Sequence, residues 1–369
     1  MSLARPVTVP VSLGKRSYSI QIGRGLLRRL GPECRQLHLG SRCALVTDAN
    51  VGPLYAAAAE KSLRSAGFEP VRITVPAGET AKRLEVVHAC HNQLAAHRLE
   101  RSSFLVALGG GVVGDLGGFV AATYLRGISF VQVPTTLLAQ VDSSVGGKVG
   151  VNLKAGKNLV GAFHQPKLVL CDLDTLRTLA PREFRAGLAE VIKYGIIFDA
   201  PLFQQLEREM KRLLRLDLRQ LAPVIARCCT IKAEVVAEDE TETGLRAILN
   251  FGHTIGHAIE NSAGYGKYLH GEAISIGQVA AARLSVGQLG LPEASVQRIG
   301  RLLAAAGLPV AIQLRATARQ RFFEAMKLDK KVSAGEVRFV LARRIGRVEW
   351  GRKVPMKEIE QALDFQANA

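Results

Sequence analysis

The sequence is poor in aromatic residues and has no long apolar run. Only 5% of its 369 residues are aromatic and one is Trp, so surfaces on which nucleic-acid bases could stack are scarce. No apolar run approaches the roughly 20 residues needed to cross a bilayer. The opening residues 1–6 lack the apolar stretch of a secretory signal. We therefore predict a protein that binds neither nucleic acid nor membrane.

Cysteine is also sparse and carries no recognisable pattern. The six cysteines are scattered, none forms a Cys-x-x-Cys pair, and Cys228 and Cys229 are adjacent, which suits neither a common disulfide nor a zinc knuckle. Reduced thiols are the expected state, and with them a cytoplasmic location. Low-complexity tracts are absent too, and the 48% hydrophobic and 22% charged residues are ordinary for a globular chain.

Lys and Arg residues outnumber Asp and Glu residues, which gives the chain a formal net charge of +17. Such a charge suits nucleic acid, an acidic membrane or anionic small molecules. One local excess of Lys and Arg, residues 315–353, is interpreted as solvated faces of helices and strands. The remaining basic residues could create a field that attracts phosphate.

The hydrophobic pattern divides the chain near residues 178–181. Before that point, short apolar runs alternate with helical patterns, which predicts a parallel, doubly wound sheet. The expected strands are Val7–Leu13, Ser17–Gly23, Cys43–Thr47, Val71–Val75, Phe104–Leu108, Ile128–Val133 and Lys167–Cys171. Helices are expected at Ala56–Ser65 and Lys82–His97.

Beyond Pro181 the periodicity is helical. Helices are expected near residues 182–198, 200–214, 218–239, 246–262, 270–290 and 294–306. A hairpin at Val337–Ala342 and Arg347–Trp350 and a helix at Lys357–Asp364 would close the chain. The length and this change of pattern predict two domains.

A glycine-rich turn follows the buried strand at 104–108. Gly109-x-Gly111-x-x-Gly114 fits the dinucleotide fingerprint and stands between a strand and a helix, as that motif requires. No acidic residue follows at about 20 residues to bind the ribose. That contact would come from elsewhere, such as Asp48 or Glu79. The alternative is a turn that only packs tightly.

A second segment is dense in small residues, lysines and amides. It comprises residues 142–148 (Asp-Ser-Ser-Val-Gly-Gly-Lys) and 156–158 (Gly-Lys-Asn). Lys148, Lys157 and Asn158 could hold a phosphate or a carboxylate, because glycines allow close backbone approach and the side chains donate. The alternative is an ordinary loop with solvated lysines.

A histidine pair suggests a metal centre. His253 and His257 are four residues apart, so a helix would place both on one face. Glu190 lies in an apolar helical segment and expects a partner. Lys193 could be that partner or could bind an anionic ligand. His270 follows a glycine-containing loop. These donor types suit Zn²⁺ or a similar ion, but spacing alone does not choose the third ligand.

At this point the sequence resembles the 3-dehydroquinate synthase family. The matching motifs are residues 75–82 (VPAGETAK), 109–118, 122–127 (ATYLRG), 133–144 (VPTTLLAQVDSS), 146–148, 156–158, 188–195 (LAEVIKYG), 250–257 (NFGHTIGH) and 269–272 (LHGE). The resemblance implies an α/β + α fold: a doubly wound NAD-binding α/β domain (1–179) followed by a mainly helical metal- and substrate-binding domain (180–369). It also implies a homodimer.

The resemblance implies NAD and Zn²⁺ (or Co²⁺) as cofactors, with roles for matching residues. Metal ligands would be Glu190, His253 and His270, leaving His257 as a polar group beside the substrate. Cofactor contacts would be Asp48, Glu79, Lys82, Gly111, Gly114, Asp115, Thr135, Thr136, Lys157 and Thr178. The substrate pocket would be lined by Asp142, Lys148, Asn158, Lys193, Lys232, Arg246 and Asn250, with Lys148, Lys193, Arg246, Asn250 and His257 nearest the chemistry. Arg126 would reach the substrate phosphate across the dimer interface. One of Lys330 and Lys331 would join it, and the resemblance does not choose between them.

The implied substrate is 3-deoxy-D-arabino-heptulosonate 7-phosphate, whose carboxylate and phosphate explain the many cationic residues. NAD would oxidise C5 transiently, phosphate would leave by β-elimination, and reduction and aldol closure would give 3-dehydroquinate. Three other functions remain as alternatives. Another sugar-phosphate cyclase would make a valiolone or an inosose. A metal-dependent polyol dehydrogenase would accumulate NADH. A nucleic-acid-binding protein is suggested by charge alone.

Overall fold

The computed structural model describes residues 6–262, 267–312, 316–328, 332–333 and 336–367. The chain forms two compact units. Unit 1 comprises residues 1–179 and 225–241, and unit 2 comprises residues 180–224 and 242–369. Within the described ranges, no helix combines the length and the apolar character that crossing a membrane demands.

Unit 1 is built on a seven-stranded sheet in the order β1-β2-β9-β6-β5-β3-β4. The strands pair in parallel except β1 with β2, which are antiparallel. Their bounds are β1 (Val7–Val11), β2 (Tyr18–Gly23), β3 (Arg42–Asp48), β4 (Glu69–Val75), β5 (Phe104–Gly109), β6 (Ser129–Pro134) and β9 (Leu168–Asp172). The predicted strands and the predicted doubly wound sheet are confirmed.

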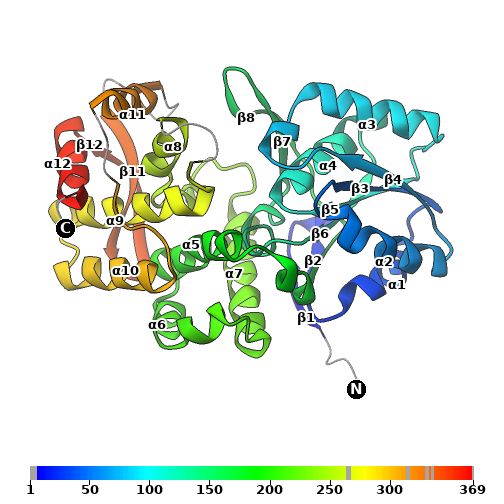
Figure 1. Ribbon diagram of the computed structural model, residues 1–369, viewed down its shortest axis with the longest axis horizontal. Helices are drawn as coiled ribbons and strands as arrows, with labels where there is room; N and C mark the ends of the chain where they lie inside the picture. Colours follow the sequence, from blue (N-terminus) through cyan, green and yellow to red (C-terminus); the bar gives the residue numbers. More distant parts are fainter. Residues whose placement is uncertain (1–5, 263–266, 313–315, 329–331, 334–335, 368–369) are drawn as a thin grey trace. The chain divides into compact units, whose positions relative to one another are not determined.

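Helices cover both faces of this sheet (Figure 1). Because side chains alternate along a strand, Ala44 and Val46 of β3 pack with α3 and α4, whereas Cys43 and Leu45 pack with α1 and α2. The helices are η2 (Leu26–Arg29), α1 (Leu30–Gln36), α2 (Gly52–Ser65), α3 (Leu84–Ala96) and α4 (Gly111–Thr123). Short helical turns are η1 (Gly14–Arg16), η3 (Glu79–Ala81), η4 (Tyr124–Arg126), η5 (Ala139–Ser143) and η6 (Leu173–Thr178).

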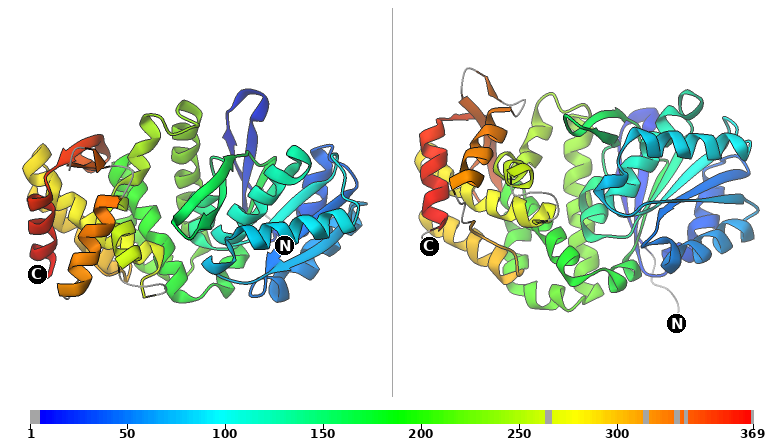
Figure 2. Two further views of the ribbon diagram at one scale, coloured as in Figure 1. Left: turned by 90° about the horizontal axis from the view of Figure 1, so that it is seen from above. Right: turned by 45° about the horizontal axis from the view of Figure 1, so that its top comes forward.

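The Ser/Gly/Lys/Asn segment is not the ordinary loop that was the alternative interpretation of its sequence. Residues 139–143 form a π-helical turn, and β7 (Lys148–Leu153) and β8 (Gly156–Phe163) form a separate antiparallel ribbon. The ribbon is visible beside the sheet of unit 1 in Figure 2. Val149 and Val151 of β7 join the core under α4. The glycines and lysines masked the short alternation of valines that buries the middle of β7, whereas β8 stays partly exposed.

Unit 2 is mainly helical, as predicted. Its helices are α5 (Pro181–Ile197), α6 (Ala200–Leu214), the start of α7 (Leu218–Glu238), η7 (Leu245–Asn250), α8 (His253–Ser262), α9 (His270–Leu289), α10 (Glu293–Ala305), α11 (Ala316–Leu328) and α12 (Met356–Ala367). Its strands β10 (Val332–Ser333), β11 (Glu336–Arg344) and β12 (Arg347–Val354) form an antiparallel sheet. The predicted hairpin and closing helix are confirmed, and helix α11 was not anticipated.

Two boundaries differ from the sequence prediction. The helix expected over 246–262 is broken between η7 and α8, because Gly252 has a φ of +79° and ends one helix before the next begins. The second domain, expected as residues 180–369, is not continuous, because residues 225–241 belong to unit 1. There Cys229 Sγ donates to Gln140 O at 3.2 Å, and Lys232 Nζ donates to Asp142 O at 2.8 Å.

Glycines bring three helices of unit 2 unusually close together. A Cβ on Gly271 of α9 would lie 1.8 Å from Ala186 O of α5, and one on Gly277 would lie 2.0 Å from Gly252 O at the start of α8. Both obstacles are backbone atoms, which cannot rotate away. Gln278 Nε2 of α9 also donates to Ala189 O of α5 at 2.9 Å. Helices α5, α8 and α9 therefore form one closely packed assembly.

We predict that Gly277→Ala lowers the free energy of unfolding by about 2 kcal/mol or more, because the new methyl group overpacks two backbones. Gly287→Ala in the same helix is the matched control, since nothing lies within 4 Å of its added Cβ. That control should raise stability by about 0.5–1 kcal/mol through better helix propensity. Urea denaturation of both variants measures the difference, and equal effects would contradict the packing argument.

Candidate metal and nucleotide sites

Glu190 is the centre of the cluster in unit 2. It lies in α5 with no exposed surface, in a helix whose neighbouring residues are apolar. Its carboxylate forms an ion pair with Lys193, one turn further along the helix, whose side chain is 1% exposed. The expected i, i+3 partner is therefore confirmed. A buried carboxylate needs such compensation, because removing it from water is costly.

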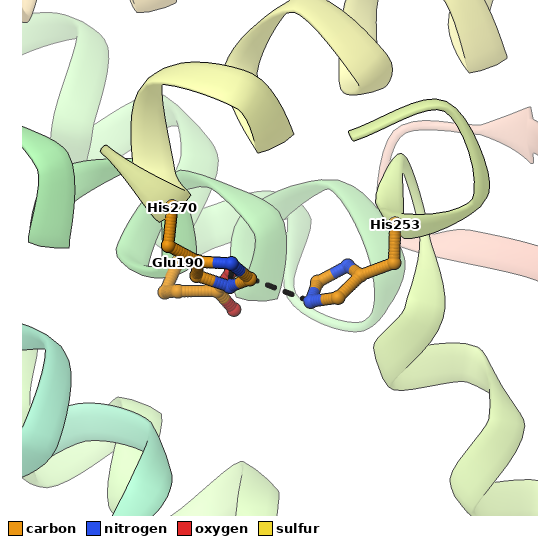
Figure 3. Close-up of side chains that lie close together, drawn as sticks. All are labelled: Glu190, His253 and His270. Carbon is orange, nitrogen blue, oxygen red and sulfur yellow. Dashed lines mark ion pairs between the residues drawn. The ribbon is translucent and has the colours of Figure 1, made fainter. Parts of the chain in front are cut away.

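Two imidazoles face the same carboxylate (Figure 3). His253 Nε2 lies 3.6 Å and His270 Nε2 lies 3.7 Å from Glu190 Oε1. One donor atom from each of the three residues lies within 4.8 Å of the other two. His253 begins α8 and His270 begins α9, so the close packing of these helices on α5 sets the geometry. One oxygen and two nitrogens are a donor set suited to Zn²⁺ or a similar cation, with positions left for substrate.

His257 lies beside this set. Its ring centroid is 5.3 Å from that of His253 and 6.1 Å from that of His270. With Glu260 and His270 it forms a second group of donors within 4.8 Å. Helix α8 does place His253 and His257 near each other, as their spacing predicted.

The environment gives the two imidazoles different proton affinities. Burial, followed by the positive charge of Lys193, lowers the pKa of His253 well below its usual value, so this ring is neutral and can donate a lone pair. Burial also lowers the pKa of His270, but the carboxylates of Glu190 and Glu260 outweigh it and raise this pKa to about 10. The two carboxylates therefore favour the charged, doubly protonated form of the His270 ring.

The start of α9 is held by its own hydrogen bonds. Leu269 N donates to Glu272 Oε2 at 2.8 Å, and Arg182 binds both carboxylate oxygens of Glu272 at 2.7 Å each. This bidentate pair fixes the turn in which His270 lies. The remaining predicted residues of unit 2 are Arg246, which is 2% exposed, and Asn250, whose Nδ2 donates to Glu242 Oε1 at 3.0 Å.

In unit 1 the glycine turn connects β5 to α4. The glycines of residues 109–118 have no positive φ, so their role is to make room. A Cβ on Gly109 would lie 2.6 Å from the Val113 side chain, and one on Gly118 would lie 2.3 Å from that of Val149. Gly110, the N-cap of α4, receives no side-chain cap. Tight packing and an anion site at the helix N-terminus are thus both compatible with this turn.

Buried polar groups surround the turn. The hydroxyl of Thr135 and the amide oxygen of Gln132 are buried and have no hydrogen-bond partner within the described part of the chain. Gln132 lies in β6 and Thr135 directly follows it. The strand paired with β6 is β5, which ends in the glycine turn. Buried polar groups without a hydrogen-bond partner are uncommon in protein cores. A polar ligand bound at the turn would supply the missing hydrogen bonds. Thr136 differs, because its Oγ1 accepts from Ala139 N at 3.2 Å.

Lys82 connects several predicted cofactor and substrate residues. Its Nζ lies 2.7 Å from Asp115 Oδ2, 2.6 Å from Asn158 Oδ1 and 3.9 Å from Glu79 Oε1. Burial raises the pKa of the Asp115 carboxyl, and the Lys82 charge opposes that rise. Glu79 lies in η3 and Lys82 directly follows it, whereas Asp115 and Asn158 come from α4 and β8, so the fold does bring these four residues together.

Other predicted residues of unit 1 have structural contacts of their own. Asp48 Oδ1 accepts from Asn50 N and Val51 N, both at 2.8 Å, and so holds the turn between β3 and α2. Lys232 Nζ lies 2.5 Å from Asp142 Oδ1. The Thr178 and Tyr55 hydroxyls are 2.5 Å apart.

The remaining predicted residues are described by position alone. Exposed Arg126 lies in η4 with a φ of +65°. Lys148 and Lys157 stand on β7 and β8. Lys330 and Lys331 lie outside the described residues.

Asn152 was not selected from the sequence, yet its hydrogen bonds organise the β7–β8 ribbon. Its N donates to Lys82 O, its Nδ2 donates to Glu79 Oε1, and its Oδ1 accepts from Asn158 N, each at 2.8 Å. Asn158 has a φ of +55°, a conformation that needs such support. Glu260, whose Oε2 lies 3.2 Å from His270 Nδ1, was also missed. Its position three residues after His257 on a helix was a usable signal.

Comparison with known proteins identifies relatives along most of the chain. Family models described as 3-dehydroquinate synthase N-terminal and C-terminal match residues 72–186 and 187–332. The 3-dehydroquinate synthase of Desulforamulus reducens is 50% identical over 356 residues, covering 96% of this chain and 99% of the relative.

Solved structures of related cyclases share the fold. A 2-deoxy-scyllo-inosose synthase complexed with carbaglucose-6-phosphate, NAD⁺ and Co²⁺ matches with a TM-score of 0.88 and 26% identity over 97% of this chain and all of the other. A 2-epi-5-epi-valiolone synthase from Streptomyces hygroscopicus with NAD⁺ and Zn²⁺ bound matches with a TM-score of 0.86 and 30% identity, covering 97% and 98% of the two chains.

We predict that Asn152→Ala loosens the β7–β8 ribbon, because it removes two side-chain hydrogen bonds and leaves the Asn158 N–H without its acceptor. Amide hydrogen exchange of peptides covering residues 148–163 should become about tenfold faster, which corresponds to about 1.4 kcal/mol of local stability. Asn92→Ala, at an exposed position of α3, is the control and should leave exchange in this ribbon unchanged. Unaltered exchange in Asn152→Ala would contradict the role given to Asn152.

Proposed function

Because the chain belongs to the 3-dehydroquinate synthase family, we propose that it converts 3-deoxy-D-arabino-heptulosonate 7-phosphate to 3-dehydroquinate and inorganic phosphate. The reaction releases phosphate without net oxidation, since C5 is oxidised and later reduced within one turnover. We assign the enzyme to the carbon–oxygen lyases acting on phosphates. The observation that carries the proposal is the convergence of Glu190, His253 and His270 in a chain 50% identical to enzymes of that name.

The residues of unit 2 fit a divalent cation. Two imidazoles with Nε2 directed at a fully buried carboxylate are a common donor set for Zn²⁺ or Co²⁺. Lys193, which pairs with Glu190, would bind an anionic part of the substrate. Arg246 and Asn250, both on η7, would bind the substrate carboxylate and hydroxyl groups. His257 would then hold or pass a proton at the substrate side.

The residues of unit 1 fit NAD⁺. The uncapped start of α4 would receive the pyrophosphate, and the orphaned Thr135 hydroxyl would gain a partner. We assign the other contacts to Asp48, Glu79, Lys82, Gly111, Gly114, Asp115, Thr136, Lys157 and Thr178. Asp142, Lys148, Asn158 and Lys232 would bind substrate, with Lys232 held in place by Asp142.

When bound, NAD⁺ supplies a reversible hydride acceptor and the cation supplies a Lewis acid that stabilises a developing alkoxide. The chain's own residues orient the substrate and balance its charge. Its lysines and arginines offset the phosphate and carboxylate, and its buried imidazoles hold their protons away from the reacting face. Orientation of this kind can account for a large part of an enzyme's rate enhancement.

Two further assignments rest on the resemblance: a homodimer, in which Arg126 contacts the phosphate in the partner's site, and a cytoplasmic location. Arg126 is exposed and lies in a turn in which Leu125 and Arg126 both have positive φ angles. This constrained backbone supports a fixed position for an arginine that would contact the partner. A mass in solution equal to one chain would exclude the dimer.

The relatives also bear on the alternative cyclase. The chain is far more similar to 3-dehydroquinate synthases than to the inosose and valiolone synthases that share its fold. A polyol dehydrogenase is distinguished by its redox balance, because it would accumulate reduced nicotinamide.

We predict that incubation with the heptulosonate phosphate and NAD⁺ releases phosphate and dehydroquinate in equal amounts, with no lasting absorbance from NADH. The reason is that the hydride removed from C5 returns within the same turnover. Phosphate, dehydroquinate and absorbance at the NADH band are followed together. NADH formed in proportion to product would favour a dehydrogenase, and no phosphate release from this substrate, together with release from a sugar phosphate that lacks the carboxylate, would favour another cyclase.

We predict that His253→Ala binds Zn²⁺ or Co²⁺ far more weakly than the unaltered chain, because one of three donors is lost. The loss of affinity should exceed the roughly 10- to 100-fold loss expected from removing a residue that only hydrogen-bonds to a metal ligand. His257→Ala is the matched control and should keep the cation while losing turnover. Competition with a chromogenic chelator measures both affinities, and EDTA should abolish activity until metal is returned. The reverse behaviour of the two variants would exchange their roles.

A further inference from the structure

The two nitrogens of His270 face two different carboxylates. Nε2 lies 3.7 Å from Glu190 Oε1, and Nδ1 lies 3.2 Å from Glu260 Oε2. Glu190 comes from α5 and Glu260 from α8, so the ring at the start of α9 lies between two helices. The Glu260 side chain is only 11% exposed. This contact is therefore part of the packed structure and not a surface ion pair.

A neutral imidazole can donate a lone pair from only one nitrogen, and the other nitrogen carries the proton. An acceptor facing Nδ1 places the proton there and leaves Nε2 free to bind a cation. His253 has the same arrangement, since its Nδ1 lies 3.3 Å from Phe251 O and its Nε2 faces Glu190. Both imidazoles thus present the same nitrogen to the cluster, each with an acceptor behind it.

The two acceptors are not equivalent. Phe251 O is a neutral carbonyl two residues before its histidine, whereas Glu260 is a carboxylate from another helix than His270. His270 also has the more open position, with 30% of its side chain exposed against 10% for His253. A ring in an open position can rotate unless a partner holds it. A charged acceptor holds it more strongly and makes Nε2 a better donor.

We propose that Glu260 is a positioning residue. It accepts a hydrogen bond from Nδ1–H of His270 and so orients the ring for Nε2 to bind the catalytic cation, an inference that rests on the proposed function. Glu260 is seven residues after His253 on α8 and shares its face of the helix. The same helix therefore carries one ligand of the cation and the partner of another. Their separation is fixed by helix geometry and does not depend on a loop.

A second cation held by His257, Glu260 and His270 is the competing interpretation, since these donors also lie within 4.8 Å of one another. It would require both nitrogens of His270 to bind a cation at once, and the ring would then have to lose its last proton. A hydrogen bond from Nδ1–H to Glu260 needs no such step. The number of cations bound per chain separates the two interpretations.

The test compares Glu260→Ala and Glu260→Gln with the unaltered chain, with Glu293→Gln as the matched control. Glu293 is a carboxylate of unit 2 that pairs with Arg283 at the surface. Zn²⁺ affinity is measured by competition with a chromogenic chelator. We expect Glu260→Ala to weaken binding about 10- to 100-fold. Glu260→Gln keeps an oxygen acceptor and should recover most of that loss, while Glu293→Gln should leave affinity unchanged.

A second readout separates orientation from general damage. In ¹⁵N-histidine spectra of the Zn²⁺-loaded protein, His270 should show a proton on Nδ1 that exchanges slowly with water. That signal should be lost in Glu260→Ala and retained in Glu260→Gln. Unchanged affinity together with an unchanged signal in Glu260→Ala would overturn the assignment. Two Zn²⁺ per unaltered chain would overturn it in favour of the second cation site, and no Zn²⁺ binding by the unaltered chain would overturn the proposed function with it.

Discussion

The buried carboxylate of Glu190 imposes the main constraint on unit 2. A charge with no exposed surface, in a helix surrounded by apolar side chains, is stable only if neighbouring groups compensate it. Lys193 does so from the same helix, and His253 and His270 face it from the starts of two others. The two histidines that help to compensate the Glu190 charge thus also provide the donor atoms that a divalent cation requires.

Close helix packing makes this arrangement possible. Gly271 and Gly277 allow α9 to approach the backbones of α5 and α8 to distances that any side chain would prevent. The two histidines are then fixed by their position at helix starts, and Glu272 and Arg182 fix one of those starts. Glycines and an ion pair that would not bind the cation themselves therefore position the two histidines that we propose as its ligands.

Unit 1 shows a comparable dependence of the site on packing. The glycine turn has ordinary backbone angles, and its glycines are needed because α4 lies so close to β5 and β7. Lys82 and Asn152 then join the ribbon β7–β8 to η3 and α4 through short hydrogen bonds. The segment whose lysines and amides suggested an anion site is held in place by this network.

Much of the fold and of the candidate site could be predicted from the sequence, because apolar periodicity, glycine turns and histidine spacing are local properties. They predicted the sheet of unit 1, most helices and the hairpin of unit 2, and they left Lys193 open as either the partner of Glu190 or a group that binds an anion. The ribbon β7–β8, the break at Gly252, the return of residues 225–241 to unit 1, and the roles of Asn152 and Glu260 depend on segments distant in the chain. Tertiary structure alone decided them, since a hydrogen bond or a backbone contact between remote residues leaves no periodic trace in the sequence.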